Sequence, residues 1–223
     1  MEDQFIRQSG IVDGNKLSKV NVTLVGAGGI GSVTASFLAK MGVKNFRLYD
    51  FDDVEVHNIP NQMFPISSVG QPKVDALAAH MRYMEGEDLF IECFNEKFTT
   101  KHRDESGILI CAVDSMEARE DIWRAAKLSK SVMHFIDGRM GGWVCHRMYA
   151  DMVQKEDKKY YESTLFADEE AVALPCTERA IIFNTGAIGS IIADTVAKVV
   201  QEHPVQRHVV YDMMNSAMLQ MGE

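Results

Sequence analysis

Short apolar runs alternate with helix-like segments along the first half of the chain. The runs are rich in β-branched residues and four to six residues long, which is typical of strands that are buried on both faces of a sheet. They cover residues 20–25, 46–49, 89–94, 108–113 and 132–136. Strands that alternate with helices predict an α/β fold with a mainly parallel sheet, helices on both faces and ligands at the carboxyl ends of the strands.

Three helices are expected between these strands. The first carries apolar residues at near-helical spacing and should end before Gly42, because glycine readily takes the left-handed backbone angles of a helix end. Pro72 can open the second helix at its first turn. The third runs from about Met116 to Leu128.

The pattern changes after Val132. Residues 135–139, 143–149 and 209–211 predict strands, and residues 187–200 predict the one strong helix among them. We therefore expect antiparallel strands to continue the same sheet in the C-terminal half. Residues 151–174 are charged and weakly periodic, which is typical of a long functional loop.

The balance of charges limits the classes of partner. Lys and Arg total 23 against 32 Asp and Glu, a formal net charge of −9, which argues against nucleic acid as a partner and favours a protein with a basic face. The sequence contains no apolar run of the roughly 20 residues that a membrane span needs, so we expect no membrane association and a cytoplasmic location. Four cysteines without a C-x-x-C pair predict no structural zinc and no disulfide framework.

A glycine-rich turn carries the strongest local signal. The sequence GAGGIG, with Gly26, Gly28, Gly29 and Gly31, follows the first strand and precedes an amphipathic helix. Such glycines let the backbone approach a phosphate, and the helix start offers unpaired N–H groups. Asp50 ends the second strand about 20 residues on, where a carboxylate accepts hydrogen bonds from ribose hydroxyls. The sequence thus predicts a Rossmann-like adenosine-nucleotide site, although the turn alone would also suit NAD, FAD or a purely structural role.

Further motifs narrow the choice of nucleotide. They are Arg7-Gln8, GAGGIG, LYDFDDVEVHN at residues 48–58, Gln62, VGQPK at residues 69–73 and CAVDSMEAR at residues 111–119. In this order the set resembles the ThiF/MoeB family, whose nucleotide domain is shared with the ubiquitin-activating enzymes. The resemblance spans nearly the whole chain. It implies an adenylyltransferase that uses ATP and Mg²⁺ to adenylate the C-terminal glycine of a ubiquitin-like or sulfur-carrier protein.

The resemblance also implies roles for individual residues. Asp50 would hold the ribose, while Asn58 and Lys73 would contact the triphosphate. Asp114 would bind Mg²⁺ and could also cap the following helix. Arg7 would reach the nucleotide of the other protomer in a homodimer. The remaining candidate cofactor-binding residues are Asp52 and Gln62.

The organisation of the chain follows from the same resemblance. We expect a single ThiF-like domain over residues 1–223, with a nucleotide-binding half over 1–130 and a partner-binding half over 131–223. A crossover loop at residues 151–174 would close on the partner's glycine tail. Residues 137–142, with three glycines, would line a channel for that tail or form a hairpin turn.

Two positions depart from the family or leave its chemistry open. Asn61 stands where relatives commonly have an arginine that contacts phosphates, so this position carries no charge. Many relatives also hold a structural zinc through two C-x-x-C pairs, which this chain lacks. Cys176 stands where relatives place a cysteine that in some forms a covalent link to the activated partner. It is a candidate nucleophile, with an inert thiol as the alternative.

Other functions remain open at the level of sequence. An enzyme of this kind could adenylate a short peptide or another small acid, whereas a substrate in transfer RNA is disfavoured by the acidic balance. An NAD-dependent oxidoreductase shares the glycine motif but would need a hydride site, for which no residues are evident. An inactive nucleotide-binding scaffold is the alternative outside the enzymes, and Asn61 favours it.

Overall fold

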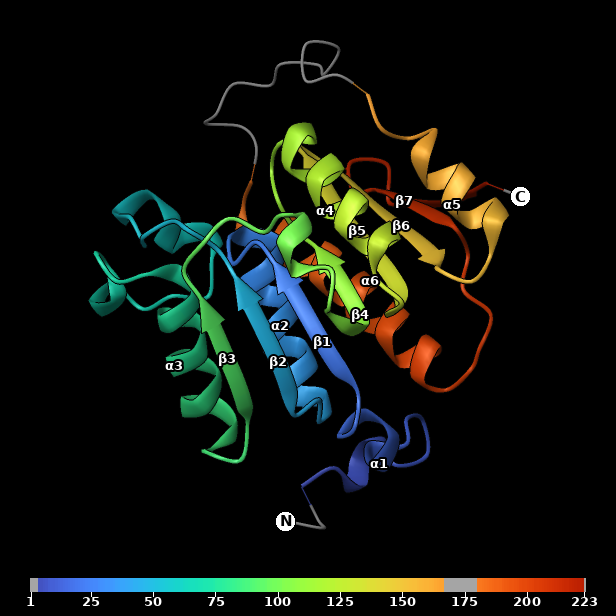
Figure 1. Ribbon diagram of the computed structural model, residues 1–223. Coiled ribbons are helices and arrows are strands. Elements are labelled where there is room, and N and C mark those ends of the chain that lie inside the picture. Colours follow the sequence, from blue (N-terminus) through green and yellow to red (C-terminus); the bar gives the residue numbers. More distant parts are fainter. Residues whose placement is uncertain (1–3, 167–179, 223) are drawn as a thin grey trace.

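The computed structural model describes residues 4–166 and 180–222, and these form one continuous eight-stranded sheet with the order β3-β2-β1-β4-β5-β6-β7-β8 (Figure 1). The strands are β1 Asn21–Val25, β2 Asn45–Tyr49, β3 Phe90–Phe94, β4 Ser106–Cys111, β5 Ser131–Gly141, β6 Val144–Asp151, β7 His208–Asp212 and β8 Ala217–Met221. β1 to β5 pair in parallel, and β6 to β8 are antiparallel. This confirms the expected fold class.

The strand order reverses at β1. From β1 the chain proceeds to β2 and β3 on one side, and then to β4 and β5 on the other. Val25, the last residue of β1, pairs with Tyr49 of β2 and with Cys111 of β4. The carboxyl ends of three strands therefore meet at one point, the position where open α/β sheets bind ligands.

Helices cover both faces of the sheet (Figure 1). α2 Gly29–Met41, α3 Lys73–Glu85 and α6 Ile182–Val200 lie on one face, and α4 Met116–Leu128 and α5 Lys155–Glu162 lie on the other. Shorter elements are α1 Gly14–Leu17 and the 3-10 helices η1 Ile6–Gln8, η2 Val56–Asn61, η3 Ile66–Ser68 and η4 Thr100–His102. No helix within residues 4–166 and 180–222 is both long and apolar enough to cross a membrane.

The continuous apolar run of β4 reflects burial on both faces. Ile108 and Ile110 belong to the core under α2, α3 and α6, whereas Leu109 and Cys111 belong to the core under α4 and α5. All four side chains are 1% exposed or less. Successive side chains of a strand point to opposite faces, so a strand between two helical layers needs apolar residues at every position.

The predicted helices agree with the structure, with one shift. α2 ends at Gly42, whose φ of 105° is left-handed and whose N–H donates to the carbonyls of Leu38 and Ala39. α4 has the predicted bounds. α6 begins at Ile182, five residues earlier than the predicted start at residue 187. Its first two residues, Ile182 and Phe183, expose apolar side chains, and the next two bury polar ones, so the helical pattern is not visible there.

Besides α1 and the 3-10 helices, two elements were not predicted. Residues 155–162 of the expected long loop form α5, because Tyr161 is buried against Trp123 and Phe135 with ring centroids 4.6 and 4.9 Å apart. Residues 167–174 of that loop lie outside the described residues. β8 pairs with β7 but exposes most of its side chains, so no alternation indicated a strand.

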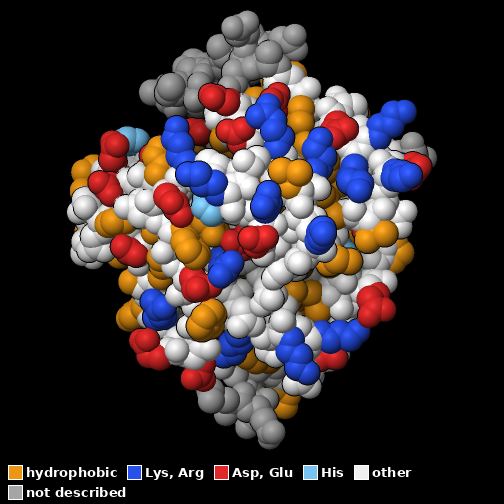
Figure 2. Space-filling model, in the orientation of Figure 1, with side chains coloured by type: hydrophobic (Ala, Val, Ile, Leu, Met, Phe, Trp, Pro, Cys, Tyr) orange, Lys and Arg blue, Asp and Glu red, His pale blue; other side chains and the backbone are white. Residues whose placement is uncertain are grey.

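The negative net charge is not spread evenly. Figure 2 shows Lys and Arg side chains gathered over α4 and α5. A hollow of about 300 Å³ on this face is lined by Lys127, Lys155, Lys158, Lys159 and Glu162. The expectation of a basic partner therefore does not apply to this face, which attracts acidic groups instead.

A pair of histidines lies between α5 and the antiparallel strands. His146 Nδ1 and His208 Nε2 are 3.0 Å apart, and Tyr160 Oη is 3.0 Å from His208 Nδ1. Burial, the neighbouring His146 and the cation of Arg139 lower the pKa of His208 to about 4. Burial also lowers the pKa of His146. The fold therefore requires His208 to be neutral.

Acid should accordingly destabilise the protein at pH values well above those at which carboxylates titrate. The unfolded chain binds a proton at His208 near pH 6.5, whereas the folded chain resists it until about pH 4. The contribution of His208 to the free energy of unfolding is therefore fully present above pH 6.5 and is lost as the pH falls. Urea unfolding should show a loss of about 2 kcal/mol between pH 7.5 and pH 5.

The exposed His203, which follows α6, provides a matched control for this prediction. His208→Asn should remove most of the pH dependence between pH 7.5 and pH 5, while His203→Asn should leave it unchanged. An equal pH dependence in the His208 variant and the parent protein would show that another group is responsible.

Candidate functional site

The glycine turn lies at the carboxyl end of β1 and admits no side chain at two positions. Gly26 has a φ of 95°, and a Cβ there would lie 2.6 Å from the carbonyl oxygen of Ala112. A Cβ at Gly31 would lie 1.8 Å from the carbonyl oxygen of Gly26. Both distances are far below van der Waals contact. The turn therefore requires glycine at both positions, which brings the backbone of β1 directly against the start of α2.

The start of α2 is open to a ligand. Gly28 is its N-cap residue, and no side chain caps the helix. The first N–H groups of an α-helix have no partner within the helix and carry the positive end of its dipole. Gly29 is flanked by Thr185 and Met140, whose Cγ2 and Cε atoms would lie 3.0 and 3.3 Å from a Cβ at this glycine. An anion such as a phosphate fits this uncapped start.

Asp50 lies beside the turn, at the end of β2. Its Oδ2 accepts a hydrogen bond from Ala27 N at 2.7 Å, and its Oδ1 accepts one from Asp52 N at 2.9 Å. Burial raises the pKa of Asp50, and the two N–H donors together with Lys73 partly offset this effect. The carboxylate is thus held in one orientation next to the glycines. It retains lone pairs for further donors such as ribose hydroxyls.

Lys73, the first residue of α3, brings a cation to the same place. Its Nζ lies 2.8 Å from Asp52 Oδ2, and its backbone N–H donates to the carbonyl of Asp52 at 2.9 Å. The Lys73 side chain is only 10% exposed, whereas that of Asp52 is 50% exposed. The ammonium group is therefore fixed by one partner, with further N–H donors available to an incoming anion.

The segment around η2 supplies amides against the turn. Asn58 is buried and its Oδ1 accepts a hydrogen bond from Glu55 N at 2.9 Å. Gln62 Nε2 lies 3.9 Å from the Cβ position of Gly28. The Oδ1 of Asn61 and the Oε1 of Gln62 are buried without a hydrogen-bond partner. Buried polar atoms are rarely left unpaired, and both of these atoms are acceptors, so they fit a ligand group that donates, such as a ribose hydroxyl or the amino group of adenine.

Asp114 follows β4 and precedes Ser115, the N-cap residue of α4. It is exposed, and the capping hydrogen bond comes from Ser115 Oγ, which accepts from Ala118 N at 3.2 Å. Ser115 is therefore the N-cap residue of α4, and Asp114 is the residue before it. Within the described residues no group of three or more His, Cys, Asp or Glu side chains could hold a metal ion. Mg²⁺ commonly uses one or two carboxylates with substrate phosphates and water, so a single exposed carboxylate fits this ion only together with a nucleotide.

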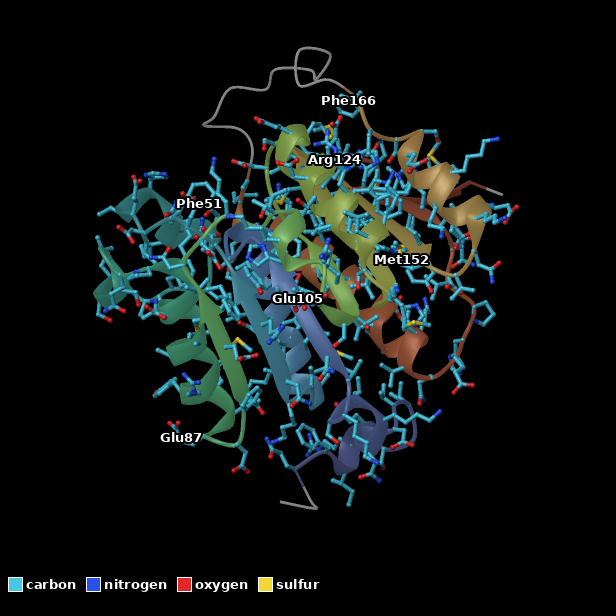
Figure 3. All side chains as sticks on the ribbon, viewed as in Figure 1. Phe51, Glu87, Glu105, Arg124, Met152 and Phe166 are labelled. Atoms are coloured by element: carbon cyan, nitrogen blue, oxygen red, sulfur yellow. The ribbon has the colours of Figure 1, made fainter. Side chains whose placement is uncertain are left out.

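Arg7 lies at the opposite end of the molecule from the turn. It belongs to η1, and its neighbour Gln8 donates to the carbonyl of Met41 at the end of α2. α2 has thirteen residues, which corresponds to about 20 Å. Arg7 also lines a hollow with Glu85. Figure 3 shows that Glu87, two residues further along the chain, lies far from Phe51, which follows Asp50 after β2. Arg7 therefore cannot reach the turn of its own chain.

The cysteines of the described residues are not activated nucleophiles. Burial raises the pKa of Cys93 and of Cys145 to about 11, and it raises the pKa of Cys111 further. A thiol with a raised pKa carries little thiolate at neutral pH. Cys176, the candidate nucleophile, lies outside the described residues.

Sequence analysis did not identify a buried charge cluster next to the site. Asp137 is completely buried and binds Arg119 Nε at 3.1 Å, Arg139 Nε at 2.7 Å and Tyr161 Oη at 3.0 Å. Burial alone would raise the pKa of Asp137, but the two arginines hold it below its usual value. Arg139 also donates to the carbonyl of Thr164 at 2.8 Å. The cluster ties β5 to α4 and α5, and the sequence DGR at residues 137–139 was its only local sign.

The chain is similar to known proteins in sequence and in fold. A protein related by sequence is the ubiquitin-like modifier-activating enzyme 5 of Bombyx mori, 35% identical over 96 residues that cover 43% of this chain and 24% of the relative. The enzyme of the same name from Culex quinquefasciatus is 33% identical over 130 residues, which cover 51% of this chain and 33% of the relative. The chain thus spans a quarter to a third of the length of these relatives.

Solved structures share the fold. PaaA has a TM-score of 0.75 at 22% identity, and the comparison covers 94% of this chain and 74% of PaaA. MccB of E. coli with ATP has a TM-score of 0.73 at 14% identity, covering 94% of this chain and 65% of MccB.

The fold and the glycine turn at the strand reversal define a Rossmann-like α/β protein of the nucleotide-binding class. The model of the ThiF family matches residues 4–222. The chain belongs to the ThiF family, as its motifs predicted.

Proposed function

We propose that this protein uses ATP to adenylate a carboxylate, and that the carboxylate is the C-terminal glycine of a ubiquitin-like or sulfur-carrier protein. The observation that carries the proposal is the buried ammonium group of Lys73 beside an uncapped helix start and two carboxylates. A dehydrogenase needs no such cation at its phosphate turn. Membership of the ThiF family and the names of the related enzymes support the same chemistry.

The proposed reaction exchanges one bond at the α-phosphorus of ATP. A carboxylate oxygen of the substrate forms a bond to this phosphorus, and the bond to the bridging oxygen of the β-phosphate breaks. Its electron pair leaves with pyrophosphate, and the product is a mixed acyl-phosphate anhydride. The attacking carboxylate is already ionised at neutral pH, so no general base is required. Neutralisation and positioning of negative charge are the main tasks of the protein.

Named residues would perform these tasks. The N–H groups of Gly28, Gly29 and the first turn of α2 would receive phosphate oxygens. Asp50 would accept hydrogen bonds from the ribose. The ammonium group of Lys73 would donate both to Asp52 and to the triphosphate. The amide nitrogens of Asn58 and Gln62 would donate to phosphate oxygens, and the amide oxygens of Asn61 and Gln62 would accept from hydroxyl or amino groups of the nucleotide. Mg²⁺ on Asp114 would add positive charge to the leaving pyrophosphate.

Further parts of the proposal concern the assembly and the partner. In a homodimer, Arg7 of each protomer would reach the nucleotide site of the other protomer. It would supply there the positive charge that Asn61 lacks. The region around residues 151–174 would close on the glycine tail, and Cys176 would receive the acyl group only if a thioester follows. We propose no structural zinc and a cytoplasmic location.

A second candidate substrate is a short peptide. It is favoured by one observation, that the chain matches MccB solved with MccA at a TM-score of 0.74 over 94% of its length. Both substrates present a carboxylate to the same site, so the chemistry on the protein side is unchanged.

ATP–pyrophosphate exchange tests the proposal directly. The purified protein with Mg²⁺ and a glycine-tailed protein or peptide should incorporate labelled pyrophosphate into ATP, and removal of the terminal glycine should abolish the exchange. Turnover of a nicotinamide cofactor without use of ATP would instead identify an oxidoreductase. ATP binding without exchange for any carboxylate would identify a scaffold.

Asp114→Ala tests the proposed magnesium site. We expect kcat/KM for exchange to fall about 10- to 100-fold, with a higher requirement for Mg²⁺, because water and phosphates supply the other ligands of this ion. Asp104→Ala is a suitable control, because Asp104 is also exposed but precedes β4 and so lies at the other end of that strand. Exchange at the parent rate and with the parent Mg²⁺ dependence would exclude Asp114 as a ligand.

A further inference from the structure

An exposed group of large apolar side chains lies outside the residues assigned so far. Trp143, Ile181, Ile182 and Phe183, which we name the apolar rim, are 43–49% exposed. The rings of Trp143 and Phe183 have centroids 5.0 Å apart. No charged residue occurs in residues 140–145 or 180–190. Exposed apolar groups that cluster in this way mark binding surfaces.

Both segments that carry the apolar rim touch the glycine turn. Thr185, two residues after Phe183, and Met140, three residues before Trp143, flank Gly29 at 3.0 and 3.3 Å from its Cβ position. Asn61 Nδ2 lies 3.5 Å from the carbonyl oxygen of Ala180, directly before the rim. The apolar rim therefore lies beside the start of α2, within reach of a chain whose end binds there.

The backbone of the apolar rim is held in place. Asn184 is 1% exposed, and its amide joins the two segments. Its Oδ1 accepts a hydrogen bond from Ile181 N at 2.9 Å, and its Nδ2 donates to the carbonyl of Gly142 at 2.8 Å. The carbonyl of Trp143 accepts a third bond from Met213 N at 2.9 Å. Such a surface loses little backbone freedom when a ligand binds.

We infer that the apolar rim is a substrate subsite for one bulky apolar side chain, located two to four residues before the carboxylate that is adenylated. This inference rests on the proposed function. The rim lies within one helical turn of Thr185, about 5 Å along α6, and its side chains extend a similar distance. An extended chain advances about 3.3 Å per residue, so about three residues separate the rim from the turn. The lack of charge selects an apolar side chain over an acidic or basic one.

Synthetic heptapeptides that end in glycine test this subsite. Three of them carry a single Phe at the second, third or fourth residue before the glycine, and a fourth has Ala at all three positions. Calorimetric titration in the presence of a non-hydrolysable ATP analogue should give at least one Phe peptide that binds about tenfold more tightly than the Ala peptide. In exchange assays the same preference should appear in KM and not in kcat.

Matched variants locate the effect. Phe183→Ser and Trp143→Ser should abolish the preference for Phe, while leaving binding of the Ala peptide unchanged. Tyr83→Ser is the control, because Tyr83 is an aromatic residue of α3 that is 90% exposed. This variant should retain the preference.

Several results would overturn the inference. They are equal binding of the Phe and Ala peptides, no binding of any peptide, or a preference that survives Phe183→Ser. Acrylamide quenching, compared between the parent protein and Trp143→Phe, reports the exposure of Trp143. Shielding of Trp143 from acrylamide in the free protein would show that the chain itself covers the apolar rim. A lower sedimentation coefficient of the Phe183→Ser variant would show that a second copy of the protein covers it. Peptide preference without any pyrophosphate exchange would refute adenylation while preserving the subsite.

Discussion

Gly31→Ala should abolish nucleotide binding and destabilise the fold. The new methyl group would lie 1.8 Å from the carbonyl oxygen of Gly26, so either the turn or the start of α2 must move. Overpacking at such a site costs about 3 kcal/mol, and displacement of the N–H groups by about 1 Å should raise the Kd for ATP about 100-fold. Urea unfolding and calorimetric titration with ATP measure the two effects.

Gly186→Ala is the control that distinguishes this steric effect from the general effect of replacing a glycine by alanine. Gly186 lies within α6, and a Cβ there would meet no atom within 4 Å. Alanine is the better helix former, so this variant should gain about 0.5–1 kcal/mol and bind ATP normally. Normal ATP affinity in Gly31→Ala would show that the turn does not hold phosphate.

Lys73→Ala should lower kcat/KM for exchange about 100- to 1000-fold, the usual effect of removing one preorganised charge from a reaction centre. The fold should tolerate this change because Asp52, the partner of Lys73, is half exposed and can be solvated. Exchange kinetics and thermal unfolding of the same preparation distinguish the two effects. Lys73→Arg should recover part of the activity, since it restores the charge with a different shape.

Lys198→Ala is the matched control for Lys73. Lys198 also pairs with an aspartate, Asp194, at 2.6 Å, but the pair is exposed on α6. Loss of an exposed pair changes stability by less than about 1 kcal/mol, and exchange should be unaffected. If Lys73→Ala retains the parent rate, the cation beside the turn has no part in catalysis.

Much of the fold was predictable because its signals are local. The parallel strands, α2, α3 and α4 each show a periodic pattern or a terminal glycine or proline within their own residues. α5 and β8 were missed because their stability comes from distant contacts. Tyr161 packs on Trp123 and Phe135, and β8 pairs with β7 without burying its own side chains.

The candidate site divides in the same way. By itself the sequence determined the fold class, the glycine turn, the acid at the end of β2 and the family, because these depend on residue type at short spacing. Only the tertiary structure decided that Lys73 binds Asp52 and that Asn184 joins residue 142 to α6. It also decided that Arg7 lies at the opposite end of the molecule from the glycine turn. The physical reason is that a side chain's partner across the fold depends on how whole elements pack, and no pattern along the chain records it.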